Sequence, residues 1–113
     1  MKPVHSQTQK IGRSKGARRV CLWNRIMIDC GFPIGQPIDL YFEHDPATGG
    51  EFLCITPNDA ARKKVSRVVN HGNVLPVIDI KENKSLDLDS LGDIGDSVRV
   101  DFYAKGEIRI SSI

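Results

Sequence analysis

The 113-residue chain has a mass of 12.6 kDa and a formal net charge of +2, with 40% hydrophobic and 27% charged residues. This length predicts one globular domain with a single core and excludes two independent domains. No apolar run approaches the roughly 20 residues that span a bilayer, and the first residues lack the apolar block of a secretory signal. We therefore expect a soluble, cytoplasmic protein with no membrane partner.

Charged residues are segregated along the chain. Residues 1–25 carry seven Lys and Arg side chains and no acidic one, whereas residues 26–55 carry five acidic side chains and no Lys or Arg. Residues 56–78 are basic again, and residues 79–113 hold eight acidic and five basic side chains. Such blocks can place positive potential on one surface of a nearly neutral protein, so we expect a nucleic acid or an acidic protein surface as partner.

The cysteines and histidines form no recognisable site. Cys21, Cys30 and Cys54 are odd in number and lack CxxC spacing, which predicts reduced, buried thiols rather than disulfides or a zinc site. The histidines are scattered without companions, at His5, His44 and His71. We therefore expect no metal, no cofactor and no catalytic constellation.

The first nineteen residues are polar and basic. Residues 1–10 show no hydrophobic period and predict a flexible arm. Residues 11–19 combine four positive charges with two glycines, which suits a segment that follows a phosphate backbone. A plain solvated basic tail explains this segment equally well.

Short apolar segments follow. Residues 20–23 read as a strand, and residues 26–30 read either as a strand or as one helical turn, after which Gly31 fits a left-handed cap. Residues 38–42 alternate between apolar and polar side chains, and residues 51–55 return as a partner strand. These two segments predict a hairpin.

A basic connecting helix is predicted at about 57–70. Residues 56–59, Thr-Pro-Asn-Asp, resemble a helix start with an N-cap and a proline at the first position. One apolar stripe then has helical spacing, at Ala61, Val65, Val68 and Val69. Most basic side chains lie off that stripe, at Arg62, Lys63, Lys64 and Arg67. A solvent-exposed face is the favoured interpretation of this charge, and contact with phosphates is the alternative.

The second half of the chain repeats features of the first. Residues 77–80 and 85–88 predict a hairpin, and a closing hairpin follows from residue 97 to residue 110. Five residues match at a spacing of sixty, because Ile34, Gly35, Ile38, Leu40 and Phe42 correspond to Ile94, Gly95, Val98, Val100 and Phe102. This register predicts an internal duplication, with repeats at 11–55 and 74–113 joined by the helical segment 56–73.

The segment Leu22 to Phe32, with Ile34-Gly35-Gln36-Pro37-Ile38 and the hairpin to Ile55, resembles the SymE-like branch of the SpoVT/AbrB swapped-hairpin family. The second half, around Leu91 to Val98, resembles the wider AbrB pattern. This resemblance implies a mainly β fold in which two units interlock as a small swapped-hairpin barrel. Two tandem copies in one chain would form a fused pseudo-dimer. The resemblance also implies a DNA-binding transcriptional regulator.

In that family, basic residues of the first hairpin contact DNA. Carried over by position, the candidate contacts are Arg18, Arg19 and Arg25, with Arg13 and Lys15 beside them, and the patch is extended by Lys63, Lys64 and Arg67. Five to eight phosphate contacts predict a log-log salt slope of roughly −4 to −7. The second repeat offers acidic residues instead, at Asp87, Asp89, Asp93 and Asp96. Equal half-sites would therefore require whole chains to dimerise, so both a monomeric pseudo-dimer and a homodimer remain open.

Two other functions remain open. A phage or mobile-element protein that binds and inhibits a host protein complex would use the same charge-segregated surfaces. The SymE-like branch is also associated with RNA-targeting toxins, for which the adjacent His44 and Asp45 form the nearest approach to an acid-base pair. We expect DNA in preference to RNA as the nucleic-acid partner.

Overall fold

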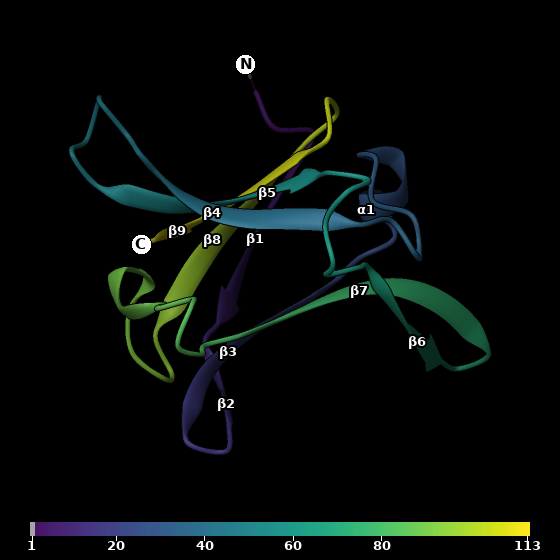
Figure 1. Ribbon diagram of the computed structural model, residues 1–113, viewed down its shortest axis with the longest axis horizontal. Helices are drawn as coiled ribbons and strands as arrows, with labels where there is room; N and C mark the ends of the chain where they lie inside the picture. The colour runs from purple at the N-terminus through teal and green to yellow at the C-terminus, as the bar shows by residue number, and fades with distance from the viewer. Residues whose placement is uncertain (1) are drawn as a thin grey trace.

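A computed structural model describes residues 2–113 as two antiparallel sheets. Figure 1 shows the five-stranded sheet in the upper part of the molecule and the four-stranded sheet below it. The five-stranded sheet has the order β1 (His5–Lys10), β8 (Ser97–Tyr103), β9 (Glu107–Ser112), β5 (Glu51–Pro57) and β4 (Ile38–His44). The four-stranded sheet has the order β2 (Gly12–Ser14), β3 (Ala17–Trp23), β7 (Asn73–Lys81) and β6 (Ser66–Asn70).

Each sheet joins one hairpin from each half of the chain. The β4–β5 and β8–β9 hairpins predicted from sequence are confirmed, and they meet through an antiparallel β5–β9 pair. The β2–β3 and β6–β7 hairpins meet through an antiparallel β3–β7 pair, in which Leu22 lies opposite Ile78. Neither sheet can therefore be completed by one half of the chain alone.

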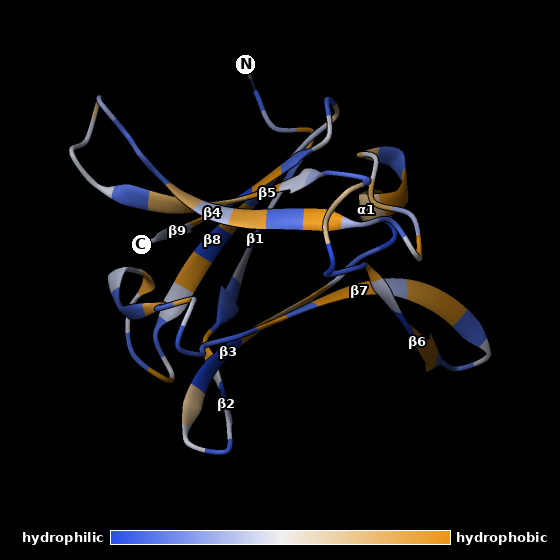
Figure 2. Ribbon diagram, viewed as in Figure 1, coloured by the Kyte–Doolittle hydropathy of each residue, from blue (hydrophilic) through white to orange (hydrophobic). Residues whose placement is uncertain are grey.

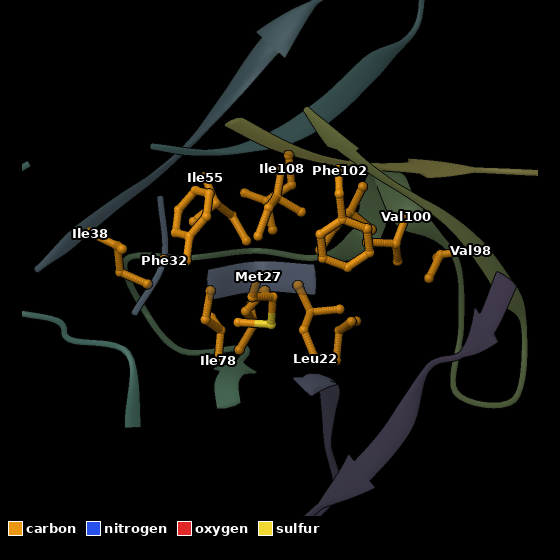
Figure 3. Packing of buried hydrophobic residues seen from close by; sticks show 14 of the residues in the cluster. Leu22, Met27, Phe32, Ile38, Ile55, Ile78, Val98, Val100, Phe102 and Ile108 are labelled. Carbon is orange, nitrogen blue, oxygen red and sulfur yellow. The ribbon is translucent and has the colours of Figure 1, made fainter. Parts of the chain in front are cut away.

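The core lies between the two sheets. Strand alternation sends every second side chain inward, and Val20, Leu22, Ile78 and Ile80 of the four-stranded sheet are fully buried. Figure 3 shows the inward side chains of the two sheets meeting, with Leu22, Met27 and Ile78 facing Val100, Phe102 and Ile108. Buried residues of both halves form one hydrophobic cluster, as expected for a chain of this length.

Residues 26–30 adopt the helical alternative. The short helix α1 (Ile26–Asp29) buries Met27, and Gly31 follows with a φ of 92°. The backbone N–H of Phe32 donates to the carbonyl oxygen of Met27 at 2.8 Å, which closes the helix end and places the Phe32 ring in the core. A three-residue 3₁₀ helix, η1 (Asp89–Leu91), buries Leu91 in the second half.

The predicted connecting helix at 57–70 is wrong. β5 runs through Pro57, and residues 66–70 form β6, which pairs with β7. The tight turn between β6 and β7 has positive φ values at both central residues, 51° at His71 and 78° at Gly72, as a two-residue hairpin turn requires. Valines at 65, 68 and 69 fit a helical stripe, but their β-branched side chains also suit a strand, and pairing with β7 decides the outcome.

Three further expectations need correction. Residues 85–88 form no strand; only an isolated bridge joins Asn83 and Leu86, and β7 pairs with β3 and β6 instead. Residues 5–10 of the predicted flexible arm form β1, because β8 offers an open edge on which His5 pairs with Phe102; Met1 lies outside the described residues. Within residues 2–113 the two sheets keep separate edges and do not close into one barrel.

The matched Ile-Gly turns have a different role from the one expected. Gly35 and Gly95 both have positive φ, 90° and 94°, so the backbone turns in the same sense at the two positions. The isoleucines that precede these glycines lie outside the core, because Ile34 is 41% exposed and Ile94 is 36% exposed. The core positions of these segments are instead taken by Ile38 and by its counterpart in the second half.

Candidate nucleic-acid interface

The tip of the β2–β3 hairpin presents two free cations. Lys15 and Gly16 form its two-residue turn with φ values of 51° and 83°. Ser14 pairs with Ala17 next to the turn, and Arg13 lies opposite Arg18 in the following pair. Arg13 and Lys15 are exposed, and neither has an ion-pair partner among residues 2–113. Figure 1 shows this hairpin projecting away from the five-stranded sheet, so the tip is open to a large partner.

Arg18, in contrast, is held by acidic residues of the second half. Its guanidinium donates to Glu82 at 2.8 Å, to Asp89 at 3.0 Å and to Asp93 at 3.1 Å. Asp87 lies 3.9 Å away. Acidic residues of the second half of the chain therefore surround an arginine of the first half, and Arg18 is not a free phosphate contact.

This cluster shifts the pKa values of its members. Hydrogen bonds to Asp93 and Glu82 raise the pKa of Arg18 above its ordinary value. The backbone N–H of Leu88 donates to Glu82 at 2.9 Å, and this bond, together with Arg18, holds the pKa of the Glu82 carboxyl below its usual range. The connector between β7 and η1 is thereby tied to β3.

Arg19 is also engaged. It makes two hydrogen bonds to Asp79, from Nε at 2.7 Å and from a terminal nitrogen at 3.1 Å. Partial burial alone would raise the pKa of Asp79, but the bonds from Arg19 outweigh it and keep the pKa low. Lys63 donates from Nζ to the backbone oxygen of Asp79 at 2.8 Å, and Lys81 lies 3.7 Å from its carboxylate.

The remaining predicted contacts are exposed but scattered. Arg25 caps α1 at the opposite end of β3 from the hairpin tip. Lys64 pairs with Pro37 in an isolated bridge, and Arg67 lies on the edge strand β6. The structure therefore brings Arg13 and Lys15 together and places Arg19 and Lys63 beside Asp79. Arg25, Lys64 and Arg67 belong to neither group.

Trp23 occupies an unexpected place. Although tryptophan is a large hydrophobic residue, its side chain is 49% exposed at the end of β3 and does not lie in the core. Val69 and Val74 are also exposed, at 67% and 51%, on the β6–β7 hairpin. For Val69 and Val74, the two-residue periodicity along residues 66–81 is the sequence signal that would have predicted a position on a strand surface.

The outer face of the five-stranded sheet carries a site that the sequence did not indicate. The Arg109 guanidinium lies between the rings of Phe52 and Tyr103, 4.9 Å from each ring centre, and pairs with Glu107 at 3.0 Å. The Cys54 thiol donates to Glu107, and burial with this carboxylate raises the pKa of Cys54 to about 12. Cys54 is therefore an inert, protonated thiol at neutral pH.

Asp45 stabilises the turn between β4 and β5, and His44 precedes it at the end of β4. The Asp45 carboxylate accepts a hydrogen bond from the backbone N–H of Ala47 at 2.9 Å, and the Asp45 backbone N–H donates to the Gly50 carbonyl. His44 is exposed at the end of β4. These contacts account for Asp45 as a structural residue of the β4–β5 connection.

Residues 2–113 contain neither a metal-binding cluster nor a membrane-spanning helix. In residues 2–113, no three His, Cys, Asp or Glu side chains converge in a way that could hold a metal ion. Over the same range, no helix is long and apolar enough to cross a bilayer. Comparisons with protein-family models, curated proteins and solved structures found no match to this chain.

Proposed function

We propose that this chain is a nucleic-acid-binding protein, with duplex DNA as the favoured partner, and that it binds through the four-stranded sheet. One observation carries the proposal: the two sheets differ in charge. Strands of the four-stranded sheet hold five basic side chains and one acidic one, namely Arg13, Arg18, Arg19, Arg67, Lys81 and Asp79. Strands of the five-stranded sheet hold three basic and five acidic ones, namely Lys10, Arg99, Arg109, Asp39, Glu43, Glu51, Asp101 and Glu107.

The β2–β3 hairpin is the proposed contact element. Within residues 2–113, Arg13 and Lys15 have no competing carboxylate, so they can neutralise phosphates without first breaking an ion pair. Arg18 lies opposite Arg13 and is fixed by its acids, so it holds the hairpin to the body of the protein. A two-stranded ribbon of this kind is narrow enough for the major groove of B-form DNA.

The strand order supports a fused pseudo-dimer of swapped-hairpin units as the finer description of the fold. Each half contributes a hairpin, a short helix and a second hairpin, in the same order along the chain. The order β2–β3–β7–β6 places the first hairpin of one half beside that of the other, and β4–β5–β9–β8 does the same for the second hairpins. This is the arrangement expected when two similar units interlock, and it fits a regulator of AbrB or SymE type.

A salt titration tests the proposal. Contact by Arg13 and Lys15 at the hairpin tip predicts a log-log slope of about −1.8 for binding to duplex DNA. Replacing Arg13 and Lys15 together with alanine should reduce the steepness by about two units, because two phosphate contacts are lost. Lys105→Ala, in the exposed turn of the β8–β9 hairpin, is the matched control and should leave the slope unchanged. A slope near zero for the wild-type chain would overturn the proposal.

A second candidate function rests on the acidic five-stranded sheet. Asp39, Glu43, Asp45 and Glu51 lie on or beside the β4–β5 hairpin, and none forms an ion pair within residues 2–113. This surface suits a basic protein, as an inhibitor of a host complex would require. Recovery of one defined protein partner after nuclease treatment, together with no direct binding to DNA, would support this function over the first.

A further inference from the structure

An apolar groove lies on the outer face of the four-stranded sheet, beside the only tryptophan of the chain. Leu22 and Ile78 point into the core, so strand alternation sends their neighbours Trp23 and Val77 to the outer face, where these two residues lie opposite each other. Figure 2 shows hydrophobic colour along β6 and the adjoining part of β7. We call this hollow the Trp23 groove; it has a volume of about 310 Å³ and is lined by Cys21, Trp23, Val68, Val69, Asn70 and Val77.

The Trp23 indole is free to stack on a planar ligand. Its side chain is 49% exposed, and within residues 2–113 neither an aromatic ring nor a cation stacks on it. The faces of nucleic-acid bases are aromatic, and proteins that bind single strands hold bases on exposed aromatic side chains next to positive charge. The indole therefore supplies one of the two features of a single-strand site.

Positive charge, the other feature, adjoins the groove. Arg19 makes two hydrogen bonds to the Asp79 carboxylate, and Lys81 lies 3.7 Å from it. Lys63 donates at 2.8 Å to the backbone oxygen of Asp79, which carries no formal charge. Three cations around one carboxylate leave an excess of two positive charges. Asp79 lies opposite Cys21 of the groove, so this excess favours an anionic ligand there.

We propose that the Trp23 groove binds one unpaired thymine of single-stranded DNA, with the base stacked on the indole and the adjoining phosphates neutralised by Lys63 and Lys81. Val77 and Asp79 are two residues apart on β7, which spans about 7 Å along a strand. A nucleotide places its phosphate at a similar distance from its base, so one nucleotide can reach both the groove and the cations.

The lining of the groove favours thymine over the uracil of RNA. Val68 and Val77 offer apolar contact to the C5-methyl group of thymine, which uracil lacks. Asn70 also lines the groove, and its side-chain amide can donate to and accept from the edge of the base. An unpaired base is required, because the edge and both faces of a paired base are already engaged in the duplex.

This site goes beyond the proposed function, because it is separate from the hairpin tip. Trp23 ends β3, six residues from Ala17 at the start of the strand, which is about 20 Å along an extended chain. Arg13 and Lys15 are therefore not part of the groove. The assignment of the Trp23 groove stands or falls without them.

Fluorescence of Trp23 tests the proposal, because the only tryptophan of the chain reports on this groove alone. A single-stranded thymidine octamer should quench the emission as its bases stack on the indole. A uridine octamer should bind about fourfold more weakly, because the contact of one methyl group is lost. Absence of quenching with the thymidine octamer at about 0.1 mM would overturn the proposal.

Two variants separate stacking from general apolar contact, with a labelled thymidine octamer and fluorescence anisotropy as the readout. Trp23→Leu keeps an apolar side chain but removes the flat ring, and it should weaken binding at least about fivefold. Tyr41→Leu changes another exposed aromatic residue, on the five-stranded sheet, and should leave the affinity unchanged. A thermal melt followed by circular dichroism checks that both variants fold. Wild-type affinity in Trp23→Leu would overturn the proposal.

Salt tests the part of the two lysines. Contact of Lys63 and Lys81 with phosphates predicts a log-log slope of about −1.4 for the octamer, and Lys63→Gln with Lys81→Gln should bring it close to zero. An unchanged slope in that variant would overturn the placement of the phosphates. Equal affinity for the two octamers would overturn the choice of thymine. Quenching by a neutral proline-rich peptide and by neither octamer would assign the groove to a protein and overturn the proposal.

The same measurements distinguish this site from the proposed function. Trp23→Leu should keep the wild-type salt slope for duplex DNA, and the variant with Arg13→Ala and Lys15→Ala should bind the thymidine octamer like the wild type. Octamer binding together with a duplex slope near zero would refute the proposed function and leave the groove assignment standing. Duplex binding without quenching by the octamer would do the reverse.

Discussion

The two hairpins of the four-stranded sheet have the same backbone and opposite chemistry. Lys15-Gly16 and His71-Gly72 turn with nearly the same φ values, 51° and 83° against 51° and 78°. One residue pair behind the turn, the first hairpin carries Arg13 opposite Arg18 and the second carries Val69 opposite Val74. The turn geometry fixes the strand register, but the side chains at the tip are free to vary, because they touch no core.

This difference shows that two hairpins with matching backbone geometry need not carry similar side chains at their tips. Arg18 also links the two hairpin units, because its acidic partners follow β7 in the second half. The basic tip is therefore supported by residues that the second half alone provides. The following predictions test how far the two hairpins share stability and where they separate in function.

The largest loss of stability is expected from a substitution at Leu22, on which both hairpins of the four-stranded sheet pack. Leu22 lies opposite Ile78 at the centre of the four-stranded sheet and is fully buried. Leu22→Ala should lower the free energy of unfolding by about 3 kcal/mol, because it removes packing and leaves a cavity under both strands. Val4→Ala, at a position that is 53% exposed, is the control and should change it by less than about 0.5 kcal/mol. Urea unfolding gives both values. Equal losses of unfolding free energy in the two variants would contradict a core position for Leu22.

Matched glycine substitutions should give equal losses of stability and different losses of function. Gly16 and Gly72 have positive φ, and a Cβ added at either position meets nothing within 4 Å. Alanine at each should cost about 1–2 kcal/mol through backbone strain alone. Gly16→Ala should weaken DNA binding, and Gly72→Ala should leave DNA binding intact. Denaturant unfolding and DNA titration provide the comparison; the same loss of DNA binding at both sites would contradict a contact confined to the β2–β3 hairpin.

Arg18→Gln should remove the support for the basic tip in a pH-dependent way. At pH 7 it should lower Tm by a few degrees, because Glu82, Asp89 and Asp93 lose their shared cation. The pKa of Glu82 is lowered in the folded chain, so its contribution is complete above the unfolded value of about 4.3 and is lost as the pH falls through the folded value. The gap in Tm between variant and wild type should therefore close in acid. Arg99→Gln, which breaks an exposed pair with Asp101, is the control and should change Tm less.

The smallest effect concerns Cys21, which lines the groove beside Trp23. Burial raises the pKa of Cys21, and the negative charge of nearby Asp79 raises it further. Alkylation of Cys21 at neutral pH should therefore be slow. Cys54 should react only after unfolding, because its pKa is about 12 and its side chain is buried. Mass spectrometry after timed alkylation measures both rates, and rapid labelling of Cys54 in the folded chain would contradict its burial.

Local patterns in the sequence predicted the five-stranded sheet better than the four-stranded one. The β4–β5 and β8–β9 hairpins are close in sequence and alternate clearly, so two-residue periodicity found both. The β6–β7 hairpin failed because Val65, Val68 and Val69 fit two periods at once. Its His-Gly turn is a weaker signal than Asn-Gly, and pairing with β7 overrode the helix.

The candidate site was predicted only in part. Sequence reasoning identified Arg13 and Lys15 as basic residues of a glycine-containing segment, but it could not tell them from Arg18 and Arg19. That distinction depends on acids 60 to 75 residues away, at Asp79, Glu82, Asp89 and Asp93. Contacts over such separations follow from the β3–β7 pairing, which no local pattern encodes.

The pairing of β1 with β8 has a consequence for synthesis on the ribosome. Ser6 and Asp101 are hydrogen-bonded neighbours although 95 residues separate them. At about 5–20 residues per second, roughly 5–20 seconds of translation pass before β1 meets its partner. The β3–β7 and β5–β9 pairs also wait for the second half of the chain. The nascent first half therefore leaves the exit tunnel with unpaired strand edges, and during that interval those edges are open to pairing with other chains.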